Sequence, residues 1–217
     1  MNTLPASAIA PAVGLPVLSQ LAPRSDERAL IVGRTGSGKT TLAERLLWHY
    51  PYVAAFDVKR RLQWRGFEAH TTLASLQRSE HTHLIYAPGI EEFDDEEATD
   101  AFFRWCFERE NTMVYVDEAM MLTNGDDMPR WYKAVVTLGR EPHVGCISST
   151  QRPKKIPQVL LSEVDCIFQF TLQLEGDRER VEEVAQVILP VRLPDHAFAY
   201  ARPGGGAAGV YRLTVEG

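Results

Sequence analysis

Four fixed positions near the start of the chain have the types and spacing needed to hold a phosphate group. In IVGRTGSGKT (31–40), Gly33 is followed after four residues by Gly38, Lys39 and Thr40, which fits the pattern G-x-x-x-x-G-K-[ST]. Glycines let the backbone turn so that successive N–H groups and a helix N-terminus point at one anion. The lysine then reaches the outer phosphates, and the threonine hydroxyl is a magnesium ligand. The pattern predicts a nucleotide site, with a glycine-rich surface turn as the alternative.

Two acids could complete that site. MVYVDEA (113–119) places Asp117 and Glu118 directly after a run of apolar residues. An acid at the C-terminal edge of such a strand lies near the phosphates, because ligands of open α/β sheets gather there. We expect Asp117 to hold magnesium, usually through water, and Glu118 to polarise the attacking water as a general base.

A third polar position follows CISST (146–150). Gln151 ends this apolar stretch and precedes Arg152 and Pro153. A lone amide beside the nucleotide can report the γ-phosphate through a hydrogen bond that hydrolysis breaks, which links chemistry to motion. The alternative is an ordinary surface turn before the proline.

The elements that must position these residues alternate along the chain. Strands are expected at 29–32, 52–59, 83–88, 112–119, 144–150 and 165–172, helices at 40–50, 70–77, 91–111 and 129–140, and a hairpin within 197–215. Alternating strands and helices predict a mostly parallel sheet covered by helices on both faces. The acidic start of 91–111 favours a helix N-terminus over a metal site.

Composition sets further bounds. The chain has 217 residues, a net charge of −6 and a sequence pI of about 5.6, so a generally basic nucleic-acid-coating protein is disfavoured and any DNA contact must be local. Cys106, Cys146 and Cys166 lack the spacing of a zinc site and are expected to be small core hydrophobes in a reducing compartment. No apolar run approaches the roughly 20 residues of a membrane span. We expect a cytoplasmic protein.

Together the motifs resemble those of a known group. GRTGSGKT, VYVDEA and STQRP, in this order and with these flanks, look like the FtsK/HerA superfamily of DNA-pumping ATPases. FDVKR (56–60) resembles its second strand, and LGREPHVG (138–145) resembles the arginine-bearing segment ahead of the sensor strand. STQRP is the most discriminating piece, and the similarity covers about residues 29–172. The resemblance implies a P-loop NTPase fold of the additional-strand, RecA/FtsK-like kind.

The resemblance also implies roles for individual residues. The sensor would be Gln151, and ATP with Mg²⁺ would be the ligands. Members of the superfamily work as ring oligomers, usually hexamers, with an arginine from the neighbouring subunit completing each site; Arg140 is the first candidate here and Arg152 the second. The implied ATP-binding residues are Gly33, Arg34, Thr35, Gly36, Ser37, Gly38, Lys39, Thr40 and Thr41, with Thr40 and Asp117 on the metal.

The chain differs from many superfamily members in what it lacks. We expect residues 1–24 to be a flexible or docked arm and 25–217 a single P-loop ATPase domain. That leaves no room for a membrane anchor, a winged-helix DNA reader or an N-terminal barrel. The remaining bare motor is similar in size to genome-packaging ATPases of membrane-containing icosahedral viruses. The resulting hypothesis is a double-stranded DNA translocase that packages a viral genome into a preformed capsid, in the host cytoplasm or associated with the virion.

Partners follow from this hypothesis. Double-stranded DNA would be held through its phosphates without base reading, and a capsid vertex or membrane protein is a further candidate partner. Three clusters of cations could line a pore, or could equally be solvated surface or subunit contacts. They are Arg60, Arg61 and Arg65; Arg130 and Lys133; and Lys154 and Lys155.

Other functions remain open. A small-molecule kinase shares the phosphate loop, but it must keep water out, so an acid placed to activate water counts against it. A GTP-dependent switch lacks its N-K-x-D motif here. An ATP-driven remodeller of protein partners and a non-motor assembly factor of a filamentous virus are further alternatives; the latter normally needs a membrane span.

Overall fold

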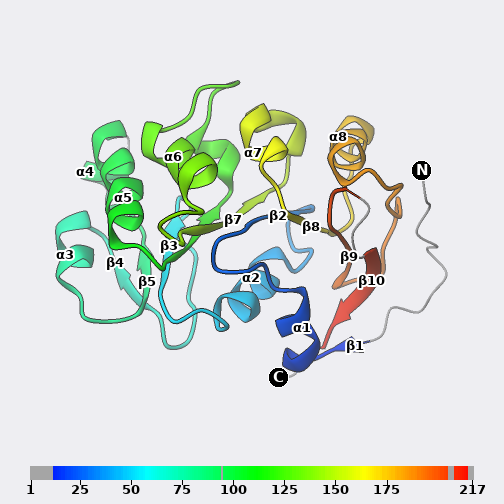
Figure 1. Cartoon of the computed structure of the whole chain (residues 1–217), viewed down its shortest axis with the longest axis horizontal. Coiled ribbons are helices and arrows are strands. Elements are labelled where there is room, and N and C mark those ends of the chain that lie inside the picture. Colours follow the sequence, from blue (N-terminus) through cyan, green and yellow to red (C-terminus); the bar gives the residue numbers. More distant parts are fainter. Residues whose placement is uncertain (1–11, 94, 205–207, 215–217) are drawn as a thin grey trace.

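One twisted sheet runs through the part of the chain that the computed structural model describes, residues 12–93, 95–204 and 208–214 (Figure 1). Within these residues the sheet has ten strands in the order β1-β10-β9-β8-β2-β7-β6-β3-β5-β4. The strands are β1 Ala12–Val13, β2 Arg28–Val32, β3 Val53–Asp57, β4 Glu68–His70, β5 His83–Tyr86, β6 Met113–Asp117, β7 Gly145–Thr150, β8 Cys166–Gln169, β9 Ala197–Ala201 and β10 Ala208–Leu213.

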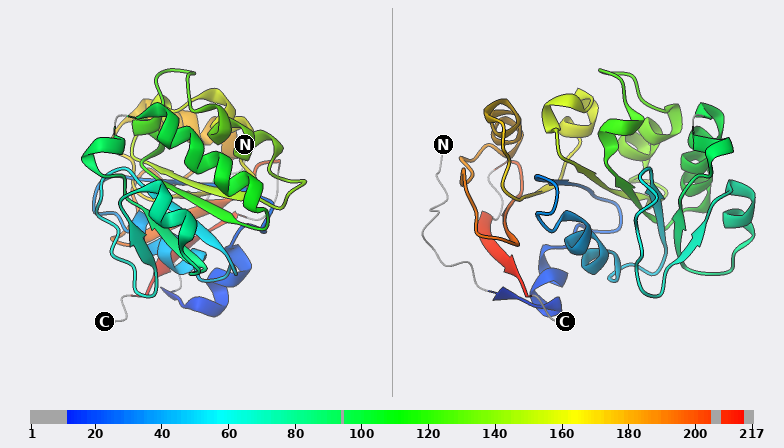
Figure 2. Two further views of the ribbon diagram at one scale, coloured as in Figure 1. Left: turned by 90° about the vertical axis from the view of Figure 1, so that its left-hand side faces the viewer. Right: turned by 180° about the vertical axis from the view of Figure 1, so that it is seen from behind.

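Helices cover both faces of this sheet (Figures 1 and 2). The α-helices are α1 Leu15–Leu21, α2 Lys39–Leu47, α3 Leu73–Arg78, α4 Ile90–Phe93, α5 Glu96–Arg109, α6 Arg130–Leu138, α7 Gln158–Ser162 and α8 Glu175–Ala185, and the 3-10 helices are η1 Ala119–Leu122 and η2 Pro153–Lys155. On one face lie α5 to α8, and on the other lie α1 and α2. Each face therefore has its own apolar core.

The sheet is parallel apart from one strand. All neighbouring pairs from β8 to β4 are parallel, whereas β9 runs antiparallel to both β8 and β10. The five strands β2, β3, β6, β7 and β8 are buried along their whole length, as expected for parallel strands with helices on both faces. In β2, Ile31 packs toward α1 and α2, and Leu30 packs toward the opposite core.

The predicted fold class is confirmed, with differences at individual elements. The expected C-terminal hairpin is present as β9 and β10, paired antiparallel from Ala201 opposite Ala208. The single helix expected at 91–111 is wrong. It is divided into α4 and α5 because the Asp95 side chain accepts hydrogen bonds from the backbone N–H groups of Glu97 and Ala98, at 2.9 and 3.1 Å, and starts a new helix.

Part of the expected N-terminal arm is folded onto the sheet. Strand β1 pairs with β10, and helix α1 contacts α2, burying Leu18 and Leu21. Residues 1–11 lie outside the described residues, as do 205–207 of the hairpin.

The three cysteines are core residues, as predicted. Cys106, Cys146 and Cys166 are free and buried, and burial raises the pKa of each thiol, to about 11 for Cys146. Across the described ranges, none of the helices has the length and apolar character that a membrane crossing requires.

Candidate active site

The strand order brings the predicted site residues to one edge of the sheet. Strands β2, β7, β6 and β3 are successive neighbours, with Val32 opposite Thr150 and Asp57 opposite Asp117. Because these strands are parallel, the chain leaves all of them at the same C-terminal edge. The phosphate loop, Gln151 and Glu118 therefore converge from three different segments.

Close packing and backbone conformation explain two of the loop glycines. A Cβ atom on Gly33 would lie 2.6 Å from Phe170 Cβ and 2.8 Å from Ser37 Oγ, so no larger residue fits there. Gly38 has φ 107° and is the N-cap of α2, a backbone conformation that side chains rarely adopt. The loop is thus able to pass close beneath a bound anion and turn directly into the helix.

Lys39 lies over its own loop. Its Nζ donates to the carbonyl oxygens of Gly33 and Arg34, at 2.8 and 3.0 Å. Burial lowers the pKa of Lys39, and the carboxylates of Glu118 and Asp117 oppose that shift. The nearby Ser37 Oγ is buried without a hydrogen-bond partner among the described residues. A buried hydroxyl left in this way is costly, and an oxyanion in the loop would satisfy it.

Asp117 is the last residue of β6 and lies in a hydrogen-bonded setting. It is 7% exposed, and its Oδ1 accepts hydrogen bonds from Tyr115 Oη and Ser149 Oγ, both at 3.2 Å. Both of these hydrogen bonds are made to Oδ1, which leaves the second carboxylate oxygen, Oδ2, available for another ligand. An oxygen of this kind suits a hard cation such as Mg²⁺.

Glu118 adopts an unusual backbone conformation. Its φ and ψ are 57° and 63°, in the left-handed region, and it is the N-cap of η1. Non-glycine residues in this region are uncommon and cluster at functional sites. The turn directs the Glu118 side chain back toward β7 and the end of β3.

The Glu118 carboxylate accepts four hydrogen bonds. Oε1 accepts from Gln151 N at 2.8 Å and Thr150 Oγ1 at 3.1 Å, and Oε2 accepts from Lys59 Nζ at 2.6 Å and Gln151 Nε2 at 2.8 Å. Burial raises the pKa of Glu118, but the hydrogen bonds from Lys59 and Gln151 outweigh it, so the pKa is lowered from its ordinary value. The hydrogen bonds and the ion pair therefore favour the ionised form of the carboxylate and fix its orientation.

Gln151 joins this carboxylate to the phosphate loop. While its Nε2 donates to Glu118, its Oε1 accepts a hydrogen bond from Thr35 Oγ1 at 2.8 Å. One amide thus connects the loop that would hold the phosphates to the acid that would activate water. If the Gln151 amide rearranged around a γ-phosphate in the loop, its hydrogen bond to Glu118 would change directly.

Two residues of this site were not assigned a role from the sequence. Lys59 forms an ion pair with Glu118, and Asp57 Oδ2 accepts from Leu62 N at 2.7 Å while its Oδ1 has no partner among the described residues. Burial and the neighbouring Asp117 raise the pKa of Asp57. The segment FDVKR stood out in the sequence, but the contact depends on the register between β3 and β6, which local pattern does not give.

The two candidate arginines lie in different places. Arg140 Nη2 donates to Asp165 Oδ1 at 2.7 Å, between the end of α6 and the starts of β7 and β8. This is the edge of the sheet opposite to the phosphate loop of the same chain. Arg152 follows Gln151 at the loop's own edge, and its Nε donates to Asp177 Oδ2 at 2.8 Å.

Thr40 and Thr41 complete the candidate nucleotide residues. They are exposed at the start of α2, next to the buried Lys39. The cradle at Gly33, the unpaired Ser37 hydroxyl and the carboxylates facing Lys39 fit a magnesium-bound nucleoside triphosphate. Thr40 and Asp117 would hold the metal.

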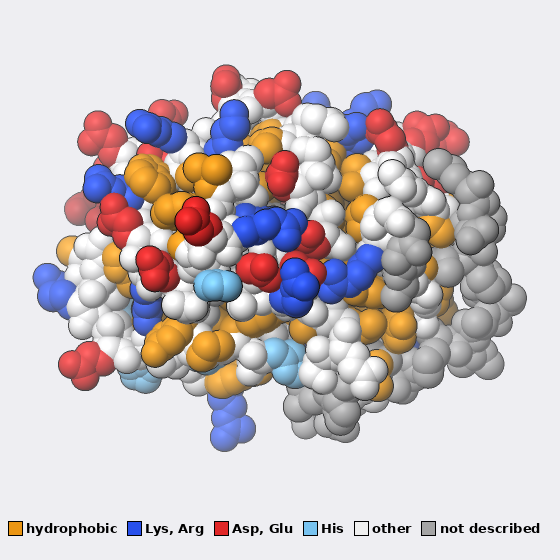
Figure 3. Space-filling model, in the orientation of Figure 1, with side chains coloured by type: hydrophobic (Ala, Val, Ile, Leu, Met, Phe, Trp, Pro, Cys, Tyr) orange, Lys and Arg blue, Asp and Glu red, His pale blue; other side chains and the backbone are white. Residues whose placement is uncertain are grey.

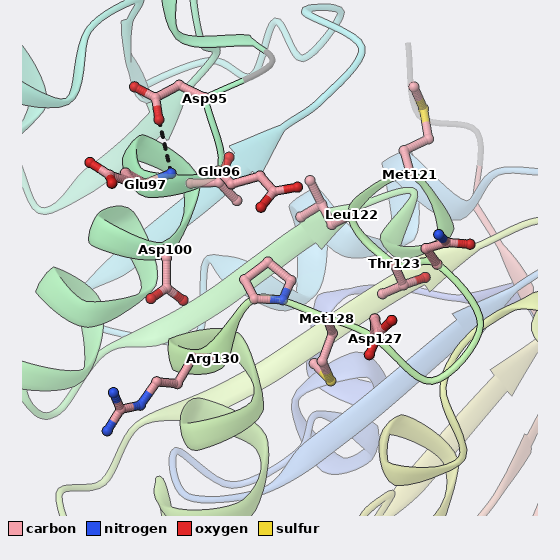
Figure 4. A pocket seen from close by; sticks show the side chains of 13 residues that line it. Asp95, Glu96, Glu97, Asp100, Met121, Leu122, Thr123, Asp127, Met128 and Arg130 are labelled. Atoms are coloured by element: carbon pink, nitrogen blue, oxygen red, sulfur yellow. Dashed lines mark hydrogen bonds between the residues drawn. The ribbon is translucent and has the colours of Figure 1, made fainter.

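A separate cavity lies outside the predicted nucleotide site. A cavity of about 600 Å³ opens between the start of α5 and the segment from η1 to α6 (Figure 4). Acids from α5 and side chains such as Met121 and Met128 line it, and none of the predicted nucleotide residues does. Asp95 caps α5 there, so the acidic run is a helix start, as predicted. The described ranges contain no group of three or more His, Cys, Asp or Glu side chains arranged to hold a metal ion.

Comparison with known proteins places the fold. No protein-family model matches the chain, and no curated protein sequence matches it. The genome packaging NTPase B204 from Sulfolobus turreted icosahedral virus 2, in complex with sulfate, is similar with a TM-score of 0.67 and 16% identity, covering 90% of this chain and 100% of that one. The same protein in complex with AMPPCP gives a TM-score of 0.66 and 15% identity, covering 88% and 100%.

A second kind of protein shares the architecture. The pCW3 conjugation coupling protein TcpA, a monomer form with ATPγS, is similar with a TM-score of 0.56 and 15% identity, covering 86% of this chain and 60% of that one. At such identities the likeness shows the fold. The chain has the α/β fold of P-loop ATPases, and the resemblance predicted from the motifs is confirmed as a likeness of fold to a genome packaging NTPase.

Proposed function

We propose that this chain hydrolyses ATP in the presence of Mg²⁺ and uses the energy to translocate double-stranded DNA, packaging a viral genome into a preformed capsid. The full-length likeness to a genome packaging NTPase supports the proposal, as does the likeness to a conjugation coupling protein. We further propose that residues 25–217 act as one ATPase domain in the host cytoplasm or on the virion.

The observation that carries the hydrolytic part is the chain of hydrogen bonds from Thr35 through Gln151 to Glu118. A carboxylate beside the phosphate loop is suited to accept a proton from an attacking water. A kinase excludes water from this position. The network therefore favours transfer of the γ-phosphoryl group to water over transfer to a small acceptor.

Each residue then has a distinct task. Lys39 and the loop N–H groups bind the phosphates, and Glu118 polarises the water. Gln151 senses the γ-phosphate. When bound, Mg²⁺ would neutralise charge on the β- and γ-phosphates, held by Thr40 and Asp117.

The proposed partners are a second copy of the chain and duplex DNA. Charge on the γ-phosphate in the transition state needs a cation, and in a hexameric ring Arg140 of a neighbouring copy would supply it. DNA would contact local cations only, since acidic and basic side chains are interleaved over the face in Figure 3. The sensor-adjacent Lys154 and Lys155 are exposed and follow Gln151 within four residues, which favours them as the moving contact.

Steady-state ATP hydrolysis by the purified chain tests the proposal. It is measured with and without linear double-stranded DNA across a series of protein concentrations, with Lys39→Ala as the inactive control. Stimulation by DNA and a steep rise of specific activity with concentration are expected for a ring with an arginine acting in trans. Flat turnover that ignores DNA would favour a protein remodeller, and turnover only with a small phosphate acceptor would favour a kinase.

A further inference from the structure

The sheet itself sets the position of Lys59. Strands β3 and β6 are parallel neighbours with Asp57 opposite Asp117, so the two strands end at the same level of the sheet. The turn after β3 is fixed, because Asp57 O accepts from Arg60 N at 3.2 Å and Asp57 Oδ2 accepts from Leu62 N at 2.7 Å. Lys59 lies inside this turn and reaches Glu118 at 2.6 Å.

The hydrogen bonds on Glu118 leave no place for a water proton. An ionised carboxylate has about four lone-pair sites, and four donors already occupy them. A general base must accept a hydrogen bond from the attacking water. One of the four donors must therefore leave before Glu118 can act.

The donors differ in what else holds them. Thr150 and the backbone N–H of Gln151 belong to β7 and its end, in the buried middle of the sheet. The Gln151 side chain also contacts Thr35 of the phosphate loop, so it is the donor that a bound γ-phosphate can draw away. Lys59 has Glu118 as its one hydrogen-bond acceptor among the described residues, so no other acceptor there competes for its ammonium group.

We propose, on the premise that the chain hydrolyses ATP, that Lys59 is a positioning residue that holds Glu118 in place while Gln151 turns from the carboxylate to the γ-phosphate. The Glu118 side chain is only 5% exposed and the Lys59 side chain 28%, so the ammonium is the charged partner that keeps this buried carboxylate tolerable. Without Lys59, the charge of Lys39, which already interacts with Glu118, is left to attract it. The base would then turn away from the attacking water.

The test compares turnover with nucleotide binding in the full chain. Lys59→Met keeps the length of the side chain and removes its charge, and Arg78→Met, which removes the same charge from an exposed position on α3, is the control. We expect kcat to fall about tenfold or more in Lys59→Met, while KM for ATP and the Kd of a fluorescent ATP analogue stay within about twofold, since the effect is confined to the chemical step. Thermal unfolding checks that both variants fold.

Restoring an ammonium group at position 59 shows whether the loss of kcat comes from the missing charge or from altered packing. In Lys59→Cys, 2-bromoethylamine alkylates the thiol at this partly exposed position to give an aminoethyl cysteine, whereas the three native thiols are buried. Recovery of kcat after alkylation, verified by mass spectrometry, supports the proposal. No recovery, or a kcat in Lys59→Met equal to or above that of the native chain, overturns it. A native chain that hydrolyses no ATP overturns the proposed function itself, and this inference with it.

Discussion

At the residue scale, the candidate site centres on the carboxylate of Glu118. Glu118 is buried to 4% exposure and fully hydrogen bonded, in a backbone conformation that costs energy. Backbone strain of this kind clusters at functional sites. Its carboxylate is the group whose replacement should separate nucleotide binding from hydrolysis.

Glu118→Gln keeps the shape of the side chain and removes the general base. We expect hydrolysis to fall by a factor of about 10² to 10⁴, while a fluorescent ATP analogue still binds because the phosphate loop is unchanged. Single-turnover hydrolysis and equilibrium binding measure the two effects. Glu80→Gln, at an exposed position just after the end of α3, is the control; ordinary turnover in Glu118→Gln would remove Glu118 from the mechanism.

Thr35→Val tests the link between the loop and Gln151. The change removes the hydroxyl that donates to Gln151 Oε1 and leaves a side chain of the same shape. Loss of one such hydrogen bond corresponds to about 0.5–1.5 kcal/mol, so we expect kcat to fall about two- to tenfold. Thr35→Ser, which retains the hydroxyl, should stay close to the native rate, and equal losses in both variants would argue against the link.

At the scale of elements, an ion pair links the end of β9 to the start of β2 across the intervening strand β8. Arg202, after β9, donates through two nitrogens to the carboxylate of Glu27, before β2, at 2.9 and 3.0 Å. Glu27 is 5% exposed and also accepts from Arg24 N. The pair ties the antiparallel strand β9 to the start of the central strand.

Arg202→Met should destabilise the fold in a pH-dependent way. Burial raises the pKa of Glu27, but the hydrogen bonds from Arg202 and Arg24 outweigh it, so its folded-state pKa lies below the ordinary value of 4.5. The pair's contribution is therefore fully present above about pH 4.5 and is lost as the pH falls through the folded-state value.

Urea unfolding measures this contribution. At pH 7 we expect Arg202→Met to lower the free energy of unfolding by about 2 kcal/mol, and the difference from the native chain should shrink as the pH is lowered below the ordinary value of 4.5. Arg212→Met on β10, where the arginine is exposed, is the control. A difference that stays constant with pH would mean that Arg202 acts through packing.

How much of this could be predicted from sequence depends on whether the cause is local. The strands around the phosphate loop were predicted because they are buried apolar runs, and Asp117 and Glu118 because they follow one. Strand β4 was not, because Glu68–His70 has no apolar run and exists through pairing with β5. Helix α8 was not, because its sequence is mostly charged and buries little beyond Val181 and Ala185.

The site shows the same division. The motifs predicted side chains that the structure gathers at one edge of the sheet, since each follows a strand that local pattern identifies. They did not predict the ion pair of Lys59 with Glu118, because it follows from Asp57 lying opposite Asp117 across two strands. The spacing of residues within one segment does not predict contacts that depend on the register between distant strands.

At the scale of the whole molecule, the position of Arg140 decides what it can do. It lies at the edge of the sheet opposite to its own phosphate loop and pairs there with Asp165. It therefore cannot reach its own Glu118 site. If Arg140 takes part in hydrolysis, it acts on a second copy. The activity lost by replacing Arg140 should then be restored when a neighbouring copy supplies an intact Arg140.

Mixing two inactive variants tests this. Arg140→Ala keeps an intact phosphate loop, and Lys39→Ala keeps an intact arginine. We expect each alone to hydrolyse little ATP, because loss of such an arginine corresponds to about 10³–10⁵ in rate. In an equal, randomly assembled mixture, about a quarter of the interfaces would join the intact loop of one to the intact arginine of the other, and activity should return toward that fraction.

The control mixture contains Lys39→Ala and Glu118→Gln. Both residues belong to the part of the site that one chain supplies, so every site with an intact Glu118 lacks Lys39. That mixture should stay inactive. Because the Arg140 side chain is 48% exposed, losing its ion pair should change stability by no more than about 1 kcal/mol, which thermal unfolding checks. Native activity in Arg140→Ala alone would exclude Arg140 as the arginine that acts in trans. The assignment would then pass to Arg152, which lies at the same edge as the loop and would first have to leave Asp177.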